Sequence, residues 1–384
     1  MRVLLLPTSV GAMSSGLSRQ LRRLGIDTEV WTIEQDYLEY PVDRVVLAPG
    51  ASPLRQLWRV LRAGTYVFGR WDVVHYNYGS TLYSNGGKLL DRGGGPDTGV
   101  RRLLGRLLDG VAMLAQRGEL LVLRLRRIPY FVHYLGDDAR QGDYSLAHHE
   151  IGLATQVPPG YYTPESDAWK RRQIVRMTRR AAGVYAVNPD LLDVLPPSAA
   201  FVPYGHVDVA AVEPAYTQAE HERLVFAHAP SHRAVKGTDA FLAALEALRA
   251  EGHDFELDLI EGVSNAEALE RYRQADVLLD QLHAGWYGGV AVETMALGKP
   301  VVAYIRDADL RHLPPEMTAE LPLIRATSAS VQDVLSGILE TPRDELVALA
   351  ARSRRYVERW HDPVAIATRI AADYRRALGT EGSP

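Results

Sequence analysis

Short apolar runs alternate with helix-forming segments along this chain, and this alternation constrains the fold more than any other feature. Seven runs in the first half have the character of strands: residues 3–6, 28–32, 45–47, 73–77, 130–134, 184–188 and 201–203. The alternation then restarts, and it predicts further strands at residues 224–227, 255–260, 277–279 and 301–304. Continuous apolar strands that alternate with helices predict parallel sheets covered on both faces.

The restart divides the chain into two α/β domains, each doubly wound and Rossmann-like. A chain of 384 residues is long for a single domain, which favours the same division. The linker falls within residues 205–223, so we assign residues 1–207 to an N-terminal domain and residues 208–362 to a C-terminal domain. A final helix over residues 363–379 begins at Pro363, because proline suits the first turn of a helix.

Composition excludes several classes of function. The chain has no cysteine, which removes disulfides, thiolate nucleophiles and cysteine-based metal sites. A formal net charge of −4 gives no overall basic signature for binding nucleic acid. The first apolar run is too short for a signal peptide, and no run approaches the length of a transmembrane helix. We therefore expect a cytoplasmic protein, whose oligomeric state the sequence leaves open.

Two stretches are long and irregular for connections within a compact domain. Residues 85–99 are rich in glycine, and residues 143–166 contain a Pro-Pro-Gly-Tyr-Tyr sequence. Loops of this length are usually functional or disordered. A mobile loop is expected at residues 85–99.

A glycine-rich turn lies between a predicted strand and a predicted helix in the second half. It contains Gly285, Gly288 and Gly289, and the helix starts near Val290. Glycines before a helix let backbone N–H groups approach a phosphate closely, and the helix N-terminus adds partial positive charge. Glu293 lies one turn into this helix, where its carboxylate can accept hydrogen bonds from a ribose. The alternative is an ordinary α/β loop with a capping glycine.

A second turn, over residues 228–238, also joins a strand to a helix. Arg233 and Lys236 lie three residues apart near the expected N-terminus of that helix, and His228 and Ser231 precede them. Two cations there would hold a diphosphate and stabilise the charge on a departing nucleoside diphosphate. The alternative is a solvated basic cap.

The first half contains a histidine at the carboxyl end of a predicted parallel strand. Ligands in open α/β sheets bind outside such ends, so His133 is a candidate for binding a sugar hydroxyl. Asp137, Asp138 and Arg140 follow it and are candidates for orienting an acceptor. A lone strand histidine is also compatible with a place in the core. The adjacent aspartates lack further metal ligands at suitable spacing, so a helix cap or a partner for Arg140 is favoured over a metal site.

Three further segments carry weaker signals. The loop with Gly11, Ser14 and Ser15 follows the first strand and is a candidate for approaching a phosphate or an acceptor. Residues 204–208 fall at the domain junction and are interpreted as a hinge. Residues 148–150, His-His-Glu, are interpreted as part of a surface helix, because adjacent side chains on a helix point apart.

Taken together, these motifs resemble the retaining glycosyltransferases with the GT-B fold, specifically the family 4-like group. The resemblance is strongest over residues 224–305. Residues 230–238 look like the family's basic diphosphate-binding turn, and residues 285–300 look like its nucleotide-sugar signature. His133 is similar to the family's histidine beside the donor sugar, and Gly11 to its N-terminal glycine-rich loop.

The resemblance implies two Rossmann-like domains that face a cleft, with the C-terminal helix crossing back onto the N-terminal domain. The family signature has two glutamates separated by seven residues. Glu293 matches the second, whereas Gly285 stands where the first is expected. The donor sugar is therefore expected to be held differently, with Asp280, Gln281 and His283 as candidates.

The function implied is metal-independent transfer of a sugar, with retention, from a nucleotide-sugar to an acceptor hydroxyl. The expected catalytic residues are His133, Arg233 and Lys236. No cofactor is expected beyond the nucleotide-sugar co-substrate, linked to UDP, GDP or dTDP. The acceptor is a small molecule, a lipid-linked compound or a saccharide. Two alternatives remain open: a GT-B-type nucleotide-sugar epimerase, and a non-catalytic subunit that binds a nucleotide-sugar.

Overall fold

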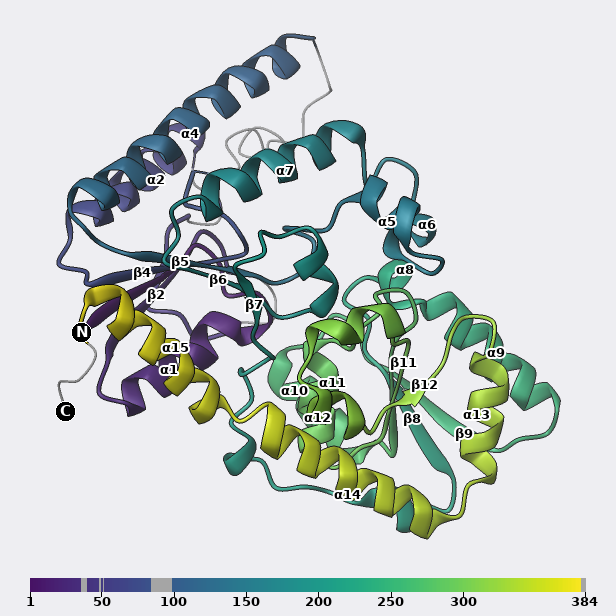
Figure 1. The fold of residues 1–384 in the computed structure, drawn as a ribbon. Coiled ribbons are helices and arrows are strands. Elements are labelled where there is room, and N and C mark those ends of the chain that lie inside the picture. The colour runs from purple at the N-terminus through teal and green to yellow at the C-terminus, as the bar shows by residue number, and fades with distance from the viewer. Residues whose placement is uncertain (36–39, 48–49, 51, 84–98, 381–384) are drawn as a thin grey trace.

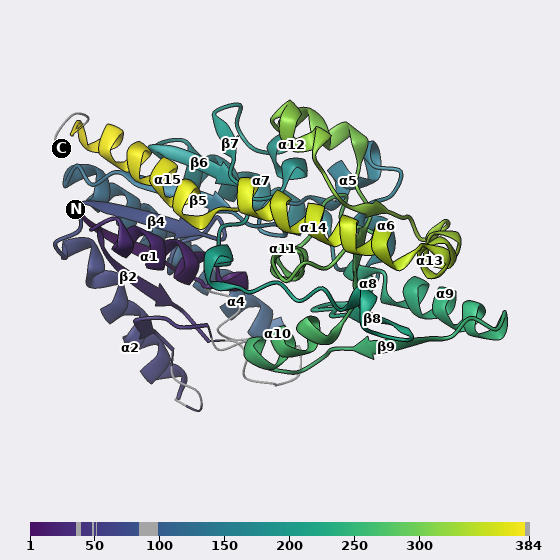
Figure 2. The ribbon, with the colours of Figure 1, turned by 90° about the horizontal axis from the view of Figure 1, so that it is seen from below.

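The computed structural model describes residues 1–35, 40–47, 50, 52–83 and 99–380. The loop expected at residues 85–99 lies outside the described residues, apart from Gly99. The described chain forms two α/β units, each built around a parallel sheet (Figures 1 and 2).

The N-terminal sheet has seven parallel strands in the order β3-β2-β1-β4-β5-β6-β7. Its strands are β1 (Arg2–Leu6), β2 (Asp27–Thr32), β3 (Arg44–Val45), β4 (Val73–Asn77), β5 (Tyr130–Tyr134), β6 (Gly183–Ala186) and β7 (Ala199–Phe201). Every residue of β4 and β5 is buried, as expected for central strands covered on both faces.

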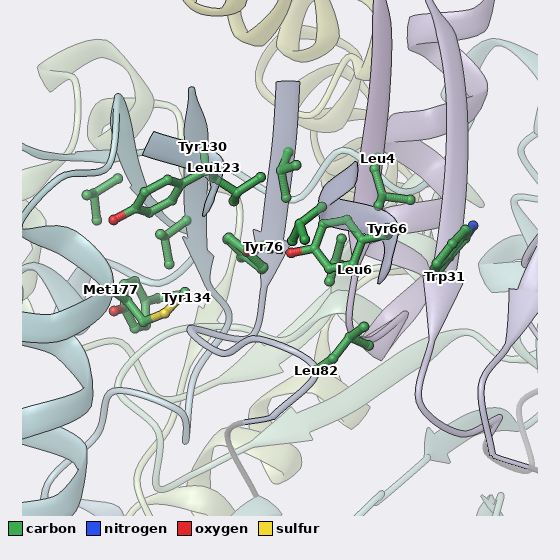
Figure 3. Packing of buried hydrophobic residues seen from close by; sticks show 14 of the residues in the cluster. Leu4, Leu6, Trp31, Tyr66, Tyr76, Leu82, Leu123, Tyr130, Tyr134 and Met177 are labelled. Carbon is green, nitrogen blue, oxygen red and sulfur yellow. Dashed lines mark hydrogen bonds between the residues drawn. The ribbon is translucent and has the colours of Figure 1, made fainter. Parts of the chain in front are cut away.

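Helices cover the two faces of this sheet in different ways. One face packs against α2 (Pro53–Gly64), α4 (Gly99–Leu125) and α7 (Pro164–Thr178). Figure 3 shows side chains of this layer, where Leu123 of α4 and Met177 of α7 lie with Tyr76 of β4 in one apolar cluster.

The opposite face packs against α1 (Met13–Arg23) and α15 (Pro363–Leu378). Ile370 and Tyr374 of α15 pack there with Phe131 of β5. The C-terminal helix thus returns to the N-terminal sheet, in yellow beside the purple α1 in Figure 1.

The C-terminal sheet has five parallel strands in the order β12-β11-β10-β8-β9. Its strands are β8 (Leu224–His228), β9 (Phe255–Leu259), β10 (Val277–Gln281), β11 (Val301–Ala303) and β12 (Ile324–Arg325). Its helices are α8 (Arg233–Lys236), α9 (Thr238–Ala250), α10 (Asn265–Gln274), α11 (Gly289–Ala296), α12 (Pro315–Ala319), α13 (Val331–Glu340) and α14 (Arg343–Trp360).

Each sheet has a point where the chain changes its direction of travel across the strands. In the N-terminal sheet this point lies between β1 and β4, and in the C-terminal sheet it lies between β8 and β10. Ligands of open α/β sheets bind outside the carboxyl ends of the strands at such points. The topology therefore predicts a ligand site at the loops after β8 and β10.

Two local predictions need correction. The helix expected to begin near Arg233 and Lys236 is divided, because Gly237 has φ +75° and separates the single turn α8 from α9. Lys236 consequently ends a one-turn helix rather than opening a long one. The stretch expected to be irregular over residues 143–166 contains most of α5 (Gly142–His148), then α6 (Leu153–Gln156) and the start of α7.

Candidate functional site

A buried ion pair lies at the switch point of the C-terminal sheet. Nζ of Lys236, which follows β8, lies 2.6 Å from Oδ1 of Asp280 in β10. Both side chains are less than 9% exposed. Removing two charges from water is costly, and one good contact with additional hydrogen bonds offsets this cost. The other carboxylate oxygen of Asp280 supplies such a bond, because it accepts the N–H of Gly288 at 2.7 Å.

The glycine at position 288 is required by this close approach. A Cβ atom on Gly288 would lie 2.9 Å from Nζ of Lys236 and 3.3 Å from Oδ1 of Asp280. Gly288 is also the N-cap of α11, so Gly289 and Val290 open that helix. The first N–H groups of a helix have no partner within it. A buried ammonium and the start of α11 therefore lie together, an arrangement suited to an anion.

Glu293 lies one turn further along α11 and lines a cavity of about 350 Å³. Its carboxylate accepts a hydrogen bond from Nδ2 of Asn265 at 3.3 Å, and Nε2 of His206 lies 3.5 Å from it. Nδ1 of His206 is buried and has no hydrogen-bond partner among the described residues. A carboxylate, an amide and an imidazole with an unused nitrogen thus meet in one cavity of a size typical of small-ligand sites.

His206 also connects this cavity to the start of α11 and to the N-terminal domain. A Cβ atom on Gly289 would lie 3.3 Å from the His206 ring, and one on Gly16 of α1 would lie 2.6 Å from its Cα atom. Ala12, Ser15 and Arg19 line the same cavity from the N-terminal domain. The cavity is therefore interdomain, as a cleft between two Rossmann-like units requires.

The loop around Gly11 is shaped by its own hydrogen bonds. Gly11 has φ +56° within the turn that leads to α1. Oγ of Ser14 donates to the carbonyl of Thr8 at 2.5 Å, and Oγ of Ser15 donates to the carbonyl of Ala12 at 3.1 Å. Both hydroxyls are engaged in the loop itself, so an acceptor contact would use the lone pairs that remain.

The structure does not bring Arg233 together with Lys236. The Arg233 guanidinium forms a bidentate pair with Glu261, at 2.9 and 2.5 Å, and its side chain is half exposed. Ser231 is exposed in the same turn. His228 is fully buried, with Nδ1 against the carbonyl of Leu279 and Nε2 against the Thr238 hydroxyl. His228 therefore holds the turn in place.

His133 lies under α15. Its ring contacts those of His75 and Tyr185, and it is 2% exposed. Burial, with a smaller contribution from the charge of Arg369, lowers its pKa to about 3. The imidazole is therefore neutral near pH 7. Its expected contact with a donor sugar stays a prediction, and this location favours the alternative of a core histidine.

The three residues predicted to orient an acceptor have separate partners. Asp137 accepts hydrogen bonds from the Tyr161 and Tyr162 hydroxyls. Asp138 is partly buried and accepts the N–H groups of Leu135 and Gly136, and its removal from water raises its pKa to about 6.

Arg140 forms a bidentate pair with Asp190, at 2.6 and 3.1 Å. The sequence suggested Asp137 or Asp138 as the partner of Arg140, whereas the structure pairs Arg140 with Asp190. Arg140 and Asp190 also line a small interdomain pocket of about 20 Å³, together with His283 and Arg306. The pocket has room for about one water molecule.

Gly285 and His283 lie on the C-terminal side of this pocket. A Cβ atom on Gly285, which has φ +75°, would lie 2.7 Å from Cζ of Arg306. An arginine therefore fills the space beside the position where the family signature has its first glutamate. Nδ1 of His283 donates to the Ala234 carbonyl at 2.7 Å, and Nε2 lies 3.0 Å from the Ser328 hydroxyl.

One group of side chains has the spacing of metal ligands among the described residues. His149, Asp193 and Asp309 each offer a ligand atom, and these atoms lie within 4.8 Å of one another. Both carboxylates already have cationic partners, since Asp193 pairs with Arg311 and Asp309 pairs with Arg306. The His-His-Glu segment thus contributes its second histidine to an interdomain cluster, which the sequence did not suggest.

Three residues of the site were not predicted from the sequence. His206 was interpreted as part of a hinge, and Asn265 and Arg306 were not singled out. Asn265 carried a usable signal, because Ser264 caps α10 and places the next residue at the carboxyl edge of the sheet. Arg306 lies 21 residues after Gly285, and only the parallel pairing of β10 with β11 brings it back.

Comparison with known proteins identifies the fold. No family model matches the chain, and no curated protein matches it. Among solved structures, a sucrose-phosphate synthase from Thermosynechococcus elongatus matches with TM-score 0.61 and 14% identity over 99% of both chains. HepE from Anabaena, in complex with UDP-glucose, matches with TM-score 0.57 and 14% identity, over 97% of this chain and 98% of that one.

A putative UDP-N-acetylglucosamine 2-epimerase from Listeria monocytogenes matches with TM-score 0.52 and 12% identity, over 100% of this chain and 98% of its own. These likenesses span the whole chain, and at such identities they establish the fold. The fold expected from the sequence is confirmed: two Rossmann-like, parallel-sheet domains with the GT-B architecture.

Proposed function

We propose that this chain is a metal-independent, retaining glycosyltransferase that uses a nucleotide-sugar donor. One observation carries the proposal: the buried Lys236 ammonium lies beside the start of α11, one helical turn before Glu293 in the interdomain cavity. This arrangement suits a diphosphate at Lys236 and a ribose at Glu293. The GT-B fold and its neighbours, including one structure that contains UDP-glucose, support the same reading.

The groups at the start of α11 and those that line the cavity have different proposed roles. Lys236 and the N–H groups of Gly289 and Val290 bind the diphosphate, and Asp280 holds Lys236 and the Gly288 turn in position. Glu293 accepts hydrogen bonds from the ribose hydroxyls, while Asn265 and His206 orient its carboxylate. Because Lys236 is buried, its attraction for the departing diphosphate is stronger than it would be in water.

In the proposed reaction the acceptor hydroxyl attacks the anomeric carbon on the face from which the nucleoside diphosphate departs. The new bond joins the acceptor oxygen to that carbon, and the bond from the carbon to the phosphate oxygen breaks. A donor phosphate oxygen takes the acceptor proton. Lys236 acts by stabilising the charge that develops on the leaving group, which is the differential binding that catalysis requires.

Incubation with a panel of nucleotide-sugars, with and without sugar and lipid acceptors, tests the proposal. A glycosyltransferase releases nucleoside diphosphate in an acceptor-dependent reaction, and NMR of the product then reports retention at the anomeric carbon. Conversion of the nucleotide-sugar without acceptor would instead identify an epimerase. Binding without turnover across the panel would identify a non-catalytic subunit.

A further inference from the structure

One face of the N-terminal domain combines exposed apolar side chains with a cluster of arginines. It is formed by α4 and α7 and is termed here the α4–α7 face; Figure 1 shows the two helices along the outer edge of the domain. On α4, five apolar side chains are between 51% and 73% exposed: Leu107, Val111, Leu114, Leu121 and Leu125. Their separations of three, four and seven residues place them on one side of the helix.

A groove of about 870 Å³ runs between α4 and α7, next to this apolar stripe. Seven arginines line it: Arg117, Arg124, Arg171, Arg172, Arg176, Arg179 and Arg180. Leu121 belongs both to the stripe and to the groove, and Val175 of α7, which is 64% exposed, adds to the apolar lining. No acidic residue is among the described residues that line the groove.

Positive charge is concentrated on the α4–α7 face, whereas the whole chain has a formal net charge of −4. Arg171 pairs with Asp143, and Arg176 donates to the amide oxygens of Gln116 and Gln173. Partial burial lowers the pKa of Arg176, and the neighbouring charges of Arg117 and Arg172 lower it further. The guanidinium groups therefore repel one another, and an external anion would relieve this repulsion.

We propose that the α4–α7 face docks on the surface of an anionic lipid bilayer. Arginines bind lipid phosphates through charge-assisted hydrogen bonds, and an adjacent apolar stripe enters the boundary between headgroups and acyl chains. An exposed stripe on a helix of 27 residues, about 40 Å long, matches an extended surface. No described helix is long and apolar enough to span a bilayer.

Charge distinguishes this occupant from a second copy of the chain. In a symmetric dimer through this face, the same patch would lie against itself, and the arginine cluster of each copy would approach that of the other. An anionic surface instead meets the cluster with opposite charge. The apolar stripe alone would suit either occupant, and the arginines favour the bilayer.

The face also adjoins the cleft. Nη1 of Arg171 donates to Oε1 of Gln141 at 3.0 Å, and Gln141 lines the small interdomain pocket with Arg140 and His283. Docking through α4 and α7 would consequently bring one end of the cleft near the bilayer. This inference rests on the surface itself and stands apart from the proposed activity.

Sedimentation with vesicles tests the proposal. The full chain is mixed with vesicles of phosphatidylcholine alone, or with 30% phosphatidylglycerol, at low and high salt. We expect binding to the anionic vesicles that high salt weakens. The triple variant Arg117→Glu, Arg172→Glu and Arg179→Glu should bind at least 10-fold less, because each arginine near an anionic surface contributes about fivefold.

A matched control carries the same charge change on α14 and α15, with Arg352→Glu, Arg355→Glu and Arg375→Glu, all exposed positions. This control should bind as the wild-type chain does. Equal binding of the two triple variants, or no binding of the wild-type chain to anionic vesicles, would overturn the proposal. A dimer in light scattering that Leu114→Gln dissociates would assign the face to a second copy and would equally overturn it.

Discussion

The guanidinium of Arg306 fills the space in front of Gly285, so that a Cβ atom on Gly285 would lie 2.7 Å from its Cζ atom. Arg306 cannot move freely, because it is buried and donates to Asp309 at 2.7 Å and to the Ile151 carbonyl at 2.9 Å. Ile151 belongs to the N-terminal domain, so this arginine also joins the two halves of the cleft. Gly285 is thus coupled to the closure of the interdomain pocket.

Replacement of Gly285 by alanine should therefore destabilise the chain through two separate effects. A positive φ costs a non-glycine residue about 1–2 kcal/mol, and the new methyl group must also displace Arg306 from its buried bonds. Gly25 provides a matched control, since it has φ +77° and no atom within 4 Å of its Cβ position. Thermal unfolding should show a larger loss for Gly285→Ala than for Gly25→Ala. Equal losses of stability in the two variants would show that Arg306 moves aside without a measurable cost in free energy.

Glu119 of α4 predicts a dependence of stability on pH. Burial raises its pKa to about 7 from an ordinary value of 4.5, although hydrogen bonds from Tyr66 and Tyr76 act in the opposite direction. Between pH 4.5 and 7 the folded chain then binds more protons than the unfolded chain, so stability falls as pH rises. At 1.36 kcal/mol for each pKa unit, the loss from this group reaches about 3 kcal/mol.

The comparison of wild-type chain with Glu119→Gln isolates this effect, because the amide keeps the shape and does not titrate. Unfolding free energies measured between pH 4.5 and 8 should converge or cross as the wild-type chain loses its advantage at higher pH. Parallel curves for the two proteins would rule out titration of Glu119 in this range.

His133 should prove structural. Its ring is buried with His75 and Tyr185 beneath α15, so His133→Leu should change the affinity for a nucleoside diphosphate by less than about twofold and leave transfer largely intact. Transfer rates and calorimetric affinities of the variant measure both. A large drop in turnover at unchanged affinity would restore His133 to the place beside the donor sugar that the family resemblance implies.

Activity should persist in excess EDTA, because the proposed catalysis uses Lys236 rather than a divalent cation on the diphosphate. Transfer assays with and without chelator check this directly. Loss of transfer that Mg²⁺ or Mn²⁺ restores would point to His149, Asp193 and Asp309. In that outcome Asp309→Asn should abolish the restoration.

The architecture could be predicted from the sequence because strands and helices are specified by residues that are close together along the chain. Apolar runs of strand length, helix formers between them and Pro363 at a helix start are all visible along the chain. The predicted start of the helix near Arg233 and Lys236 was wrong, because only the backbone shows that Gly237 takes a positive φ.

The site was predictable only where its residues share one turn. Gly288 lies eight residues after Asp280, and Glu293 lies five residues after Gly288 along the same strand-turn-helix, so their proximity follows from the sequence. Lys236 and Asp280 meet through the pairing of β8 with β10, and His206 meets Glu293 across the linker. Such long-range contacts produce no periodic pattern in the sequence. The burial of His133 likewise could not be predicted, because it depends on α15, a helix more than 200 residues away.

Titration with UDP, GDP and dTDP by calorimetry tests the central claim, a nucleoside diphosphate site at Lys236 and Glu293, most directly. At least one should bind the wild-type chain, and Lys236→Met with Asp280→Asn should bind about 10- to 100-fold more weakly, since a charged hydrogen bond contributes about 1.5–3 kcal/mol. The double change removes both charges, so no unpaired carboxylate remains buried. Unchanged affinity in that folded variant, or no binding by the wild-type chain, would contradict the account.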